Sequence, residues 1–197
     1  MQNLWSSTVK QIIYANILQL ACGVLAGFYS LVAVASFVAD SASGVASGGL
    51  MSLIFDFGAI GGFIWYFVKV IKFSQIQGDD QDSAAIDKLK IAILISLVAA
   101  VLALIPGLGW LFELIGGIAS AIMALLAFSD YSRSKTLPKK GVDGAGYLKI
   151  YAIIALVGVA LSIIPVIGTI LSLICSIVAI IFMFMGWSKV ASSCPQK

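Results

Sequence analysis

The feature that most constrains the fold is an apolar unit that occurs twice. Residues 89–129 and 148–188 align without a gap at an offset of 59 residues, with 15 identities in 41 positions. Each copy runs from a basic residue through an apolar stretch to Ile-Pro-x-x-Gly, and then through a second apolar stretch to a polar exit. Proline cannot continue a helix, and glycine tolerates the backbone of a tight reversal. The unit therefore predicts a helical hairpin, with turns at Pro106 and Gly109 and at Pro165 and Gly168.

The composition places these hairpins in a membrane. Hydrophobic residues make up 61% of the chain, charged residues 11%, and the mean hydropathy is +1.09. Soluble domains average roughly 45–50% apolar and 25% charged residues. A length of 197 residues leaves room for about six spans of roughly 20 residues. We therefore predict an all-α polytopic integral membrane protein with six transmembrane helices, in which residues 1–197 form a single membrane domain.

The basic residues predict the orientation. All 12 Lys and Arg residues fall on one side of the predicted hairpins, and the opposite loops carry none. Because loops rich in Lys and Arg stay in the cytoplasm, both termini and the two long connections are expected there, in a plasma or inner membrane. The net charge of +3 then faces anionic lipid headgroups, so the expected partner is the bilayer and not nucleic acid.

The hairpins have predicted limits. A possible capping box, Thr8-x-x-Gln11, opens the first helix, and the small residues 39–49 suggest a flexible external loop. The acid-rich segment before the third helix is expected to be a solvated linker, with Asp82 or Ser83 as the helix cap. Residues 129–146 are expected to form a flexible basic loop. The predicted hairpins span about 9–72, 83–130 and 147–189.

Residues 1–75 resemble a further, diverged copy of the unit, because Lys10 opens this segment as Lys90 and Lys149 open the other two. Three copies that each start and end in the cytoplasm would form three parallel hairpins. Many transporters instead contain inverted repeats.

Small residues at helical spacing predict where helices pack closely. Gln19, Gly23 and Gly27 lie on one i, i+4 row, and an amide one turn below a GxxxG pair favours a tight contact between membrane helices. Two further pairs have the same spacing, namely Gly58 with Gly62 and Gly116 with Ser120.

Asp56 and Glu113 are the candidate functional residues. They are the two acids inside predicted spans, at a depth of roughly 8–10 Å from the outer ends of their helices. An unpaired carboxylate costs about 2.5–3.5 kcal/mol to insert, so the two acids form either an ion or proton site or neutral, hydrogen-bonded groups. The chain has no His, no phosphate-binding loop and no metal-ligand cluster, so we expect neither an enzyme nor a bound cofactor or metal.

Three hypotheses for the function follow. The first is a non-enzymatic structural or assembly subunit, either of a homo-oligomer or of a complex with other membrane proteins. The alternative is an ion or proton channel, or a small-solute transporter, that uses Asp56 and Glu113. The third is a membrane-shaping hairpin protein, because Ile91–Ile105 is short for a span.

Overall fold

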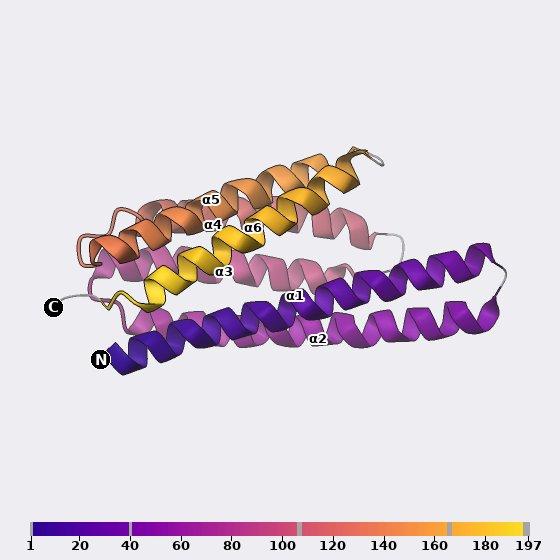
Figure 1. Cartoon of the computed structure of the whole chain (residues 1–197), viewed down its shortest axis with the longest axis horizontal. Helices are drawn as coiled ribbons and strands as arrows, with labels where there is room; N and C mark the ends of the chain where they lie inside the picture. Colours follow the sequence, from indigo (N-terminus) through magenta and orange to yellow (C-terminus); the bar gives the residue numbers. More distant parts are fainter. Residues whose placement is uncertain (1, 40, 106–107, 165–166, 195–197) are drawn as a thin grey trace. The chain divides into compact units, whose positions relative to one another are not determined.

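A computed structural model describes residues 2–39, 41–105, 108–164 and 167–194 (Figure 1). These residues form six α-helices and no strand, which confirms the all-α prediction. The predicted turn residues Pro106 and Pro165 lie outside the described residues. The helices are α1 (Gln2–Val38), α2 (Ala42–Gln75), α3 (Asp80–Leu102), α4 (Gly109–Tyr131), α5 (Lys139–Leu161) and α6 (Ile167–Ala191).

Five of these helices are long and apolar enough to cross a bilayer: α1, α2, α4, α5 and, within α6, Ile174–Ala191. Only 7% to 33% of the residues in their apolar windows are buried inside the chain. Such bare apolar helices require lipid or other helices around them. The five helices thus indicate an integral membrane protein. α3, which we predicted as a further span, is not among them; its first half carries Asp80, Asp82, Asp87, Lys88 and Lys90.

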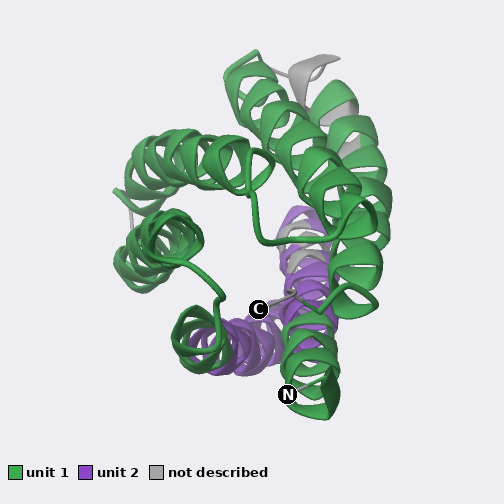
Figure 2. Cartoon of the chain, turned by 90° about the vertical axis from the view of Figure 1, so that its left-hand side faces the viewer, with its two compact units in different colours: residues 1–13, 67–197 green, residues 14–66 purple. Residues whose placement is uncertain are grey.

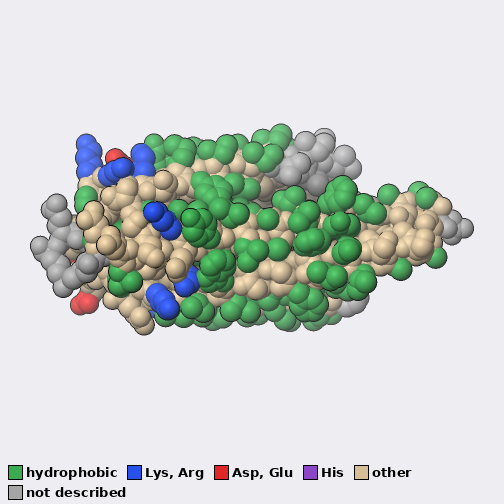
Figure 3. Space-filling view, turned by 60° about the horizontal axis from the view of Figure 1, so that its bottom comes forward, with side chains coloured by type: hydrophobic (Ala, Val, Ile, Leu, Met, Phe, Trp, Pro, Cys, Tyr) green, Lys and Arg blue, Asp and Glu red, His purple; other side chains and the backbone are tan. Residues whose placement is uncertain are grey.

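The chain forms two compact units, which Figure 2 distinguishes by colour. We call residues 14–66 the hairpin unit, and residues 1–13 with 67–197 the main unit. Every Lys and Arg in the sequence belongs to the main unit. On the face drawn in Figure 3, basic side chains gather toward one end, and hydrophobic side chains are spread over much of the remaining surface.

The core of the main unit lies at this charged end, and its largest buried side chains are aromatic. The side chains of Trp5, Phe73, Phe128, Tyr131 and Trp187 are all at most 2% exposed. The ring of Phe73 lies 4.8 Å from that of Trp5 and 5.8 Å from that of Trp187. Buried indole nitrogens usually require a hydrogen-bond partner, and Trp5 Nε1 donates to the backbone oxygen of Val190 over 2.8 Å. This bond joins the start of α1 to the end of α6.

Two predicted boundaries near the N-terminus are wrong. Thr8 does not cap α1, because the helix already begins at Gln2 and the Thr8 hydroxyl donates to the backbone oxygen of Leu4. Most of the predicted external loop is helical, since α2 begins at Ala42. The small side chains permit this helix to approach α1 closely: a Cβ on Gly48 would lie 2.8 Å from the backbone nitrogen of Ala33.

The predicted basic loop before α5 is also too long. α5 begins at Lys139, directly after Pro138, and therefore contains the glycines that suggested flexibility. Two of these glycines are packing positions, because a Cβ on Gly141 would lie 3.0 Å from Ser193 Cβ and a Cβ on Gly144 would lie 2.8 Å from the backbone oxygen of Gly186 in α6. The absence of a side chain lets α5 and α6 approach at their charged ends.

In the hairpin unit, α1 and α2 pack along a seam. The α1 residues in this seam follow each other at alternating spacings of three and four residues. Gly62 packs against the backbone of Gln19, and a Cβ on Gly58 would lie 2.9 Å from Cys22 Sγ. Farther along, Ser52 Oγ donates to the backbone oxygen of Ala26, and the Phe55 ring stacks on the Tyr29 ring at 5.6 Å. The α1 spacing is that of a coiled-coil seam, which repeats every 3.5 residues.

Gly23 does not take part in this seam. A Cβ at this position would meet no atom within 4 Å, so Gly23 itself faces away from the close contact with α2. The surroundings of Gly27 lie outside the described part of the chain. Gln19 lies in the seam and Gly23 does not, because a period of 3.5 residues leads from Gln19 to Cys22 and Ala26.

Candidate functional site

The main unit contains a buried carboxylate at its charged end. Asp82, in the first turn of α3, is 0% exposed. Its Oδ2 accepts hydrogen bonds from Ser134 Oγ at 2.6 Å and from Thr136 Oγ1 at 2.5 Å, both in the connection between α4 and α5. Among the described residues, Asp82 Oδ1 has no hydrogen-bond partner. The start of α3 thereby holds the α4–α5 connection in place.

The sequence prediction for Asp82 was wrong. The N-cap of α3 is Asp79, whose Oδ1 accepts from the backbone nitrogen of Gln81 at 3.0 Å. Ser134 and Thr136 were not predicted, because each lies more than 50 residues from Asp82 and no local spacing links them to it.

A second set of polar contacts joins α2, α3 and α4 at the same end. Asp87 Oδ1 accepts from Ser74 Oγ at 2.9 Å and from Lys90 Nζ at 2.5 Å, and the bond from Lys90 lowers the pKa of the Asp87 carboxyl. Lys88 forms an ion pair with Asp130. All these charged groups are partly exposed, so each ion pair contributes only about 0–1 kcal/mol. Their arrangement holds the ends of these helices together.

The two predicted intramembrane acids belong to different units. Asp56 lies half-buried on α2 in the hairpin unit, with Ser52 Oγ 3.5 Å from its Oδ2. Glu113 is exposed on α4 in the main unit. The hairpin unit holds another polar group at the seam, because Gln19 Oε1 is buried and has no hydrogen-bond partner among the described residues. A joint ion site at Asp56 and Glu113 stays a prediction.

The contact between α3 and α4 includes the predicted small pair Gly116 and Ser120. Gly116 lies directly against the Ala99 side chain, and the hydroxyls of Ser96 and Ser120 are 2.5 Å apart. In the contact between α5 and α6, a Cβ on Gly158 would lie 3.2 Å from the Cβ of Cys175. These two contacts are at equivalent positions of the repeat, because Gly158 lies 59 residues after Ala99 and Cys175 lies 59 residues after Gly116.

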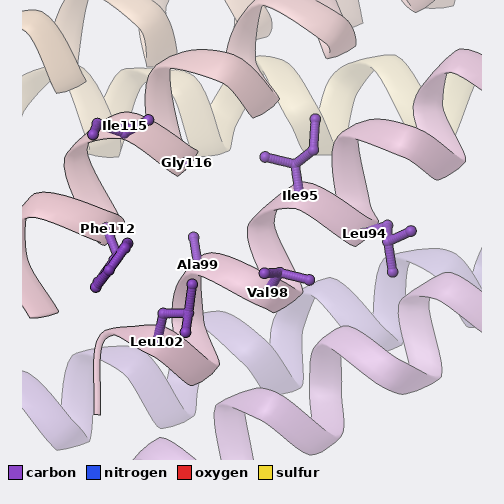
Figure 4. A pocket seen from close by; sticks show the side chains of 8 residues that line it. All are labelled: Leu94, Ile95, Val98, Ala99, Leu102, Phe112, Ile115 and Gly116. Atoms are coloured by element: carbon purple, nitrogen blue, oxygen red, sulfur yellow. The ribbon is translucent and has the colours of Figure 1, made fainter. Parts of the chain in front are cut away.

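An apolar groove of about 330 Å³ opens between α3 and α4 (Figure 4). None of its lining side chains carries a polar atom, so the groove suits a hydrocarbon chain and no charged solute. Its lining residues are Leu94, Ile95, Val98, Ala99, Leu102, Phe112, Ile115 and Gly116.

No protein-family model, curated protein or solved structure matches this chain. Within the described ranges, no group of three or more His, Cys, Asp or Glu residues is placed to hold a metal ion. The function is therefore inferred from the chain's own surfaces and contacts.

Proposed function

We propose that this protein is a non-enzymatic structural subunit that assembles in the membrane with copies of itself or with other membrane proteins. The observation that supports this proposal is a difference in burial between the charged end of the helices and their apolar parts. At the charged end, large aromatic side chains are buried, and Asp82 Oδ2 accepts a hydrogen bond from Ser134. In the apolar parts, large side chains remain open, including Phe28 at 59%, Phe57 at 63% and Ile115 at 57% exposure. A chain that is well packed at one end and exposes apolar helix surfaces elsewhere is suited to contacts with neighbouring helices in a bilayer.

The proposed architecture is three hairpins that enter from the cytoplasm, with both termini on that side. The bounds of α3 and α5 support a repeat, because the two helices begin 59 residues apart and also end 59 residues apart. The equivalent contacts of Gly116 and Gly158 support it further. The confinement of Lys and Arg to the main unit supports the cytoplasmic orientation.

Cysteine labelling tests the orientation. In a background without Cys22, Cys175 and Cys194, a cysteine at the exposed Ser43 should react with an impermeant maleimide added to intact cells. A cysteine at the exposed Lys135 should react only after the membrane is opened, since basic connections stay inside. The opposite pattern would reverse the proposed orientation.

Self-association tests the structural role. Gly23 and Gly61 face open space within the chain, so Gly23→Leu and Gly61→Leu should leave the melting temperature unchanged but lower energy transfer between labelled copies in liposomes. Gly62→Leu is the matched comparison, because its Cβ would already lie 3.0 Å from the Gln19 backbone. Overpacking there should destabilise the hairpin unit by about 1–3 kcal/mol. A chain that is monomeric at every lipid dilution would refute the homo-oligomer.

Transport is the alternative function, and the polar groups of the hairpin unit favour it. Asp56 lies beside Ser52, and Gln19 Oε1 has no hydrogen-bond partner among the described residues. Placing such polar groups in a bilayer costs free energy, and polar groups in membrane spans commonly mark an ion or substrate pathway. If they line a pathway, wild-type protein in liposomes should give pH-dependent cation flux, and Asp56→Asn with Glu113→Gln should abolish that flux without unfolding the protein. The absence of flux from wild-type protein would dismiss this alternative.

A further inference from the structure

The main unit has a second groove, of about 550 Å³, at the charged end of α5. Asp143, Gly146, Tyr147 and Ile150 line it from one face of α5, because they follow each other at helical spacings of three and one residues. Val142 of α5, Ser132 at the end of α4 and Lys189 of α6 complete the lining. The groove therefore combines an ammonium group, a carboxylate, a hydroxyl, an aromatic ring and an aliphatic side chain.

Neither charged group of the groove forms an ion pair within the described part of the chain. The ion pairs within the described part of the chain are Lys88–Asp130 and Lys90–Asp87, and neither involves Lys189 or Asp143. Lys189 Nζ lies 4.3 Å from the centre of the Tyr147 ring, which holds the ammonium at the groove. Asp143 is exposed. The groove thus offers one positive and one negative group to a ligand.

The position of the groove along the helices indicates a ligand at the membrane surface. Lys149 is the last charged residue of α5, and the remainder of that helix is apolar from Ile150 onwards. Lys189 is the last-turn basic residue of α6, after an apolar run. Ile150 is 39% exposed, so the groove continues onto an open apolar surface. A ligand with a charged head and a hydrocarbon tail fits this change of polarity.

We propose that this groove binds the headgroup of a phosphoethanolamine glycerophospholipid. Lys189 would pair with the lipid phosphate, Asp143 with the lipid ammonium, and the acyl chain would follow Ile150. The carboxylate of Asp143 repels headgroups with a net negative charge, and a primary ammonium donates hydrogen bonds to it that a quaternary ammonium cannot donate. This inference rests on the membrane location of the helices and is independent of the structural role proposed above.

Gly146 supplies a sharp test because it leaves the middle of the groove empty. A Cβ at Gly146 would meet no atom within 4 Å, so Gly146→Leu should fill the groove without disturbing the helices. Gly49→Leu is the matched control, since Gly49 also lies in a helix and faces open space, but belongs to the hairpin unit.

The experiment measures binding of tail-labelled phosphatidylethanolamine and phosphatidylglycerol to the full-length protein in detergent micelles. Wild-type protein should prefer phosphatidylethanolamine by about fivefold, the effect of one modest ion pair. Asp143→Asn should remove this preference, Lys189→Gln should weaken binding of both lipids, and Gly146→Leu should abolish binding. Gly49→Leu should bind like wild type, and melting temperatures should identify any variant that fails to fold.

Three results would overturn the proposal. The first is equal binding of both lipids by wild-type protein. The second is a preference for phosphatidylglycerol that depends on Lys189 alone, which would indicate a general anion site. The third is binding of water-soluble glycerophosphoethanolamine as tight as that of the lipid, because a tail-independent ligand would not need the apolar side of the groove. If Gly146→Leu does not fold, the Asp143 and Lys189 variants decide the question.

Discussion

Trp187→Ala should unfold the main unit at a markedly lower temperature than the wild-type protein. The indole is 1% exposed and contacts the rings of Phe73 at 5.8 Å and Phe128 at 6.1 Å. Removing a buried Trp costs about 3–5 kcal/mol, because the transfer free energy is lost and a cavity remains. The expected loss is measured by thermal unfolding in detergent, followed through the near-UV circular dichroism of the aromatic core.

Trp110→Ala is the matched control for this prediction. Trp110 lies at the start of α4 and is 68% exposed, so its removal should change the free energy of unfolding by no more than about 0.5 kcal/mol. Similar losses for both variants would mean that the charged end is not the stability-determining core. A loss confined to Trp187→Ala would support it.

Asp82→Ala should release the connection between α4 and α5. The Asp82 carboxylate accepts two short hydrogen bonds from Ser134 and Thr136, and hydrogen bonds to charged groups contribute about 1.5–3 kcal/mol each. The removal of a buried charge offsets part of this loss, so the net destabilisation should be about 2–4 kcal/mol. Amide hydrogen exchange at Thr136 and Leu137 should accelerate, since both amides donate to Ser134 Oγ.

Asp79→Ala separates this effect from helix capping. Asp79 is the N-cap of α3, and loss of its bond to the Gln81 amide should cost about 1 kcal/mol. Exchange at Thr136 and Leu137 should not change in this variant. If Asp82→Ala also leaves exchange at those two amides unchanged, the proposed link between α3 and the α4–α5 connection is wrong.

The sequence predicted the elements that depend on local patterns. Apolar runs interrupted by Pro and Gly identified the α3–α4 and α5–α6 hairpins, because a helix-breaking pattern acts within a few residues. The composition of residues 42–49 led to a wrong prediction of a loop. Ser, Ala and Gly residues are common in loops, but they equally suit a helix that packs against a neighbouring backbone. Gly48 shows the second use, through its approach to Ala33.

The polar site of the main unit could not be predicted because its contacts are distant in sequence. Asp82 resembles a helix-capping residue in its local context, and only the tertiary fold brings Ser134 and Thr136 to it. The α1 contact with α2 could not be predicted from the row through Gly23 for a different reason, since an i, i+4 row and a 3.5-residue seam diverge after one turn. In the groove of α5, Lys189 and Asp143 come from different helices and share no sequence spacing.

The hydrogen bond from Trp5 to Val190 has a consequence for biosynthesis. The residue that holds its donor is synthesised 185 positions before the residue that holds its acceptor. At about 5–20 residues per second, translation separates the two by roughly 10–40 s. Throughout this interval the indole of Trp5 lacks its final partner, so the nascent chain must remain soluble or membrane-bound with an incomplete core. Synthesis of the end of α6 therefore sets the earliest time at which the charged end can close.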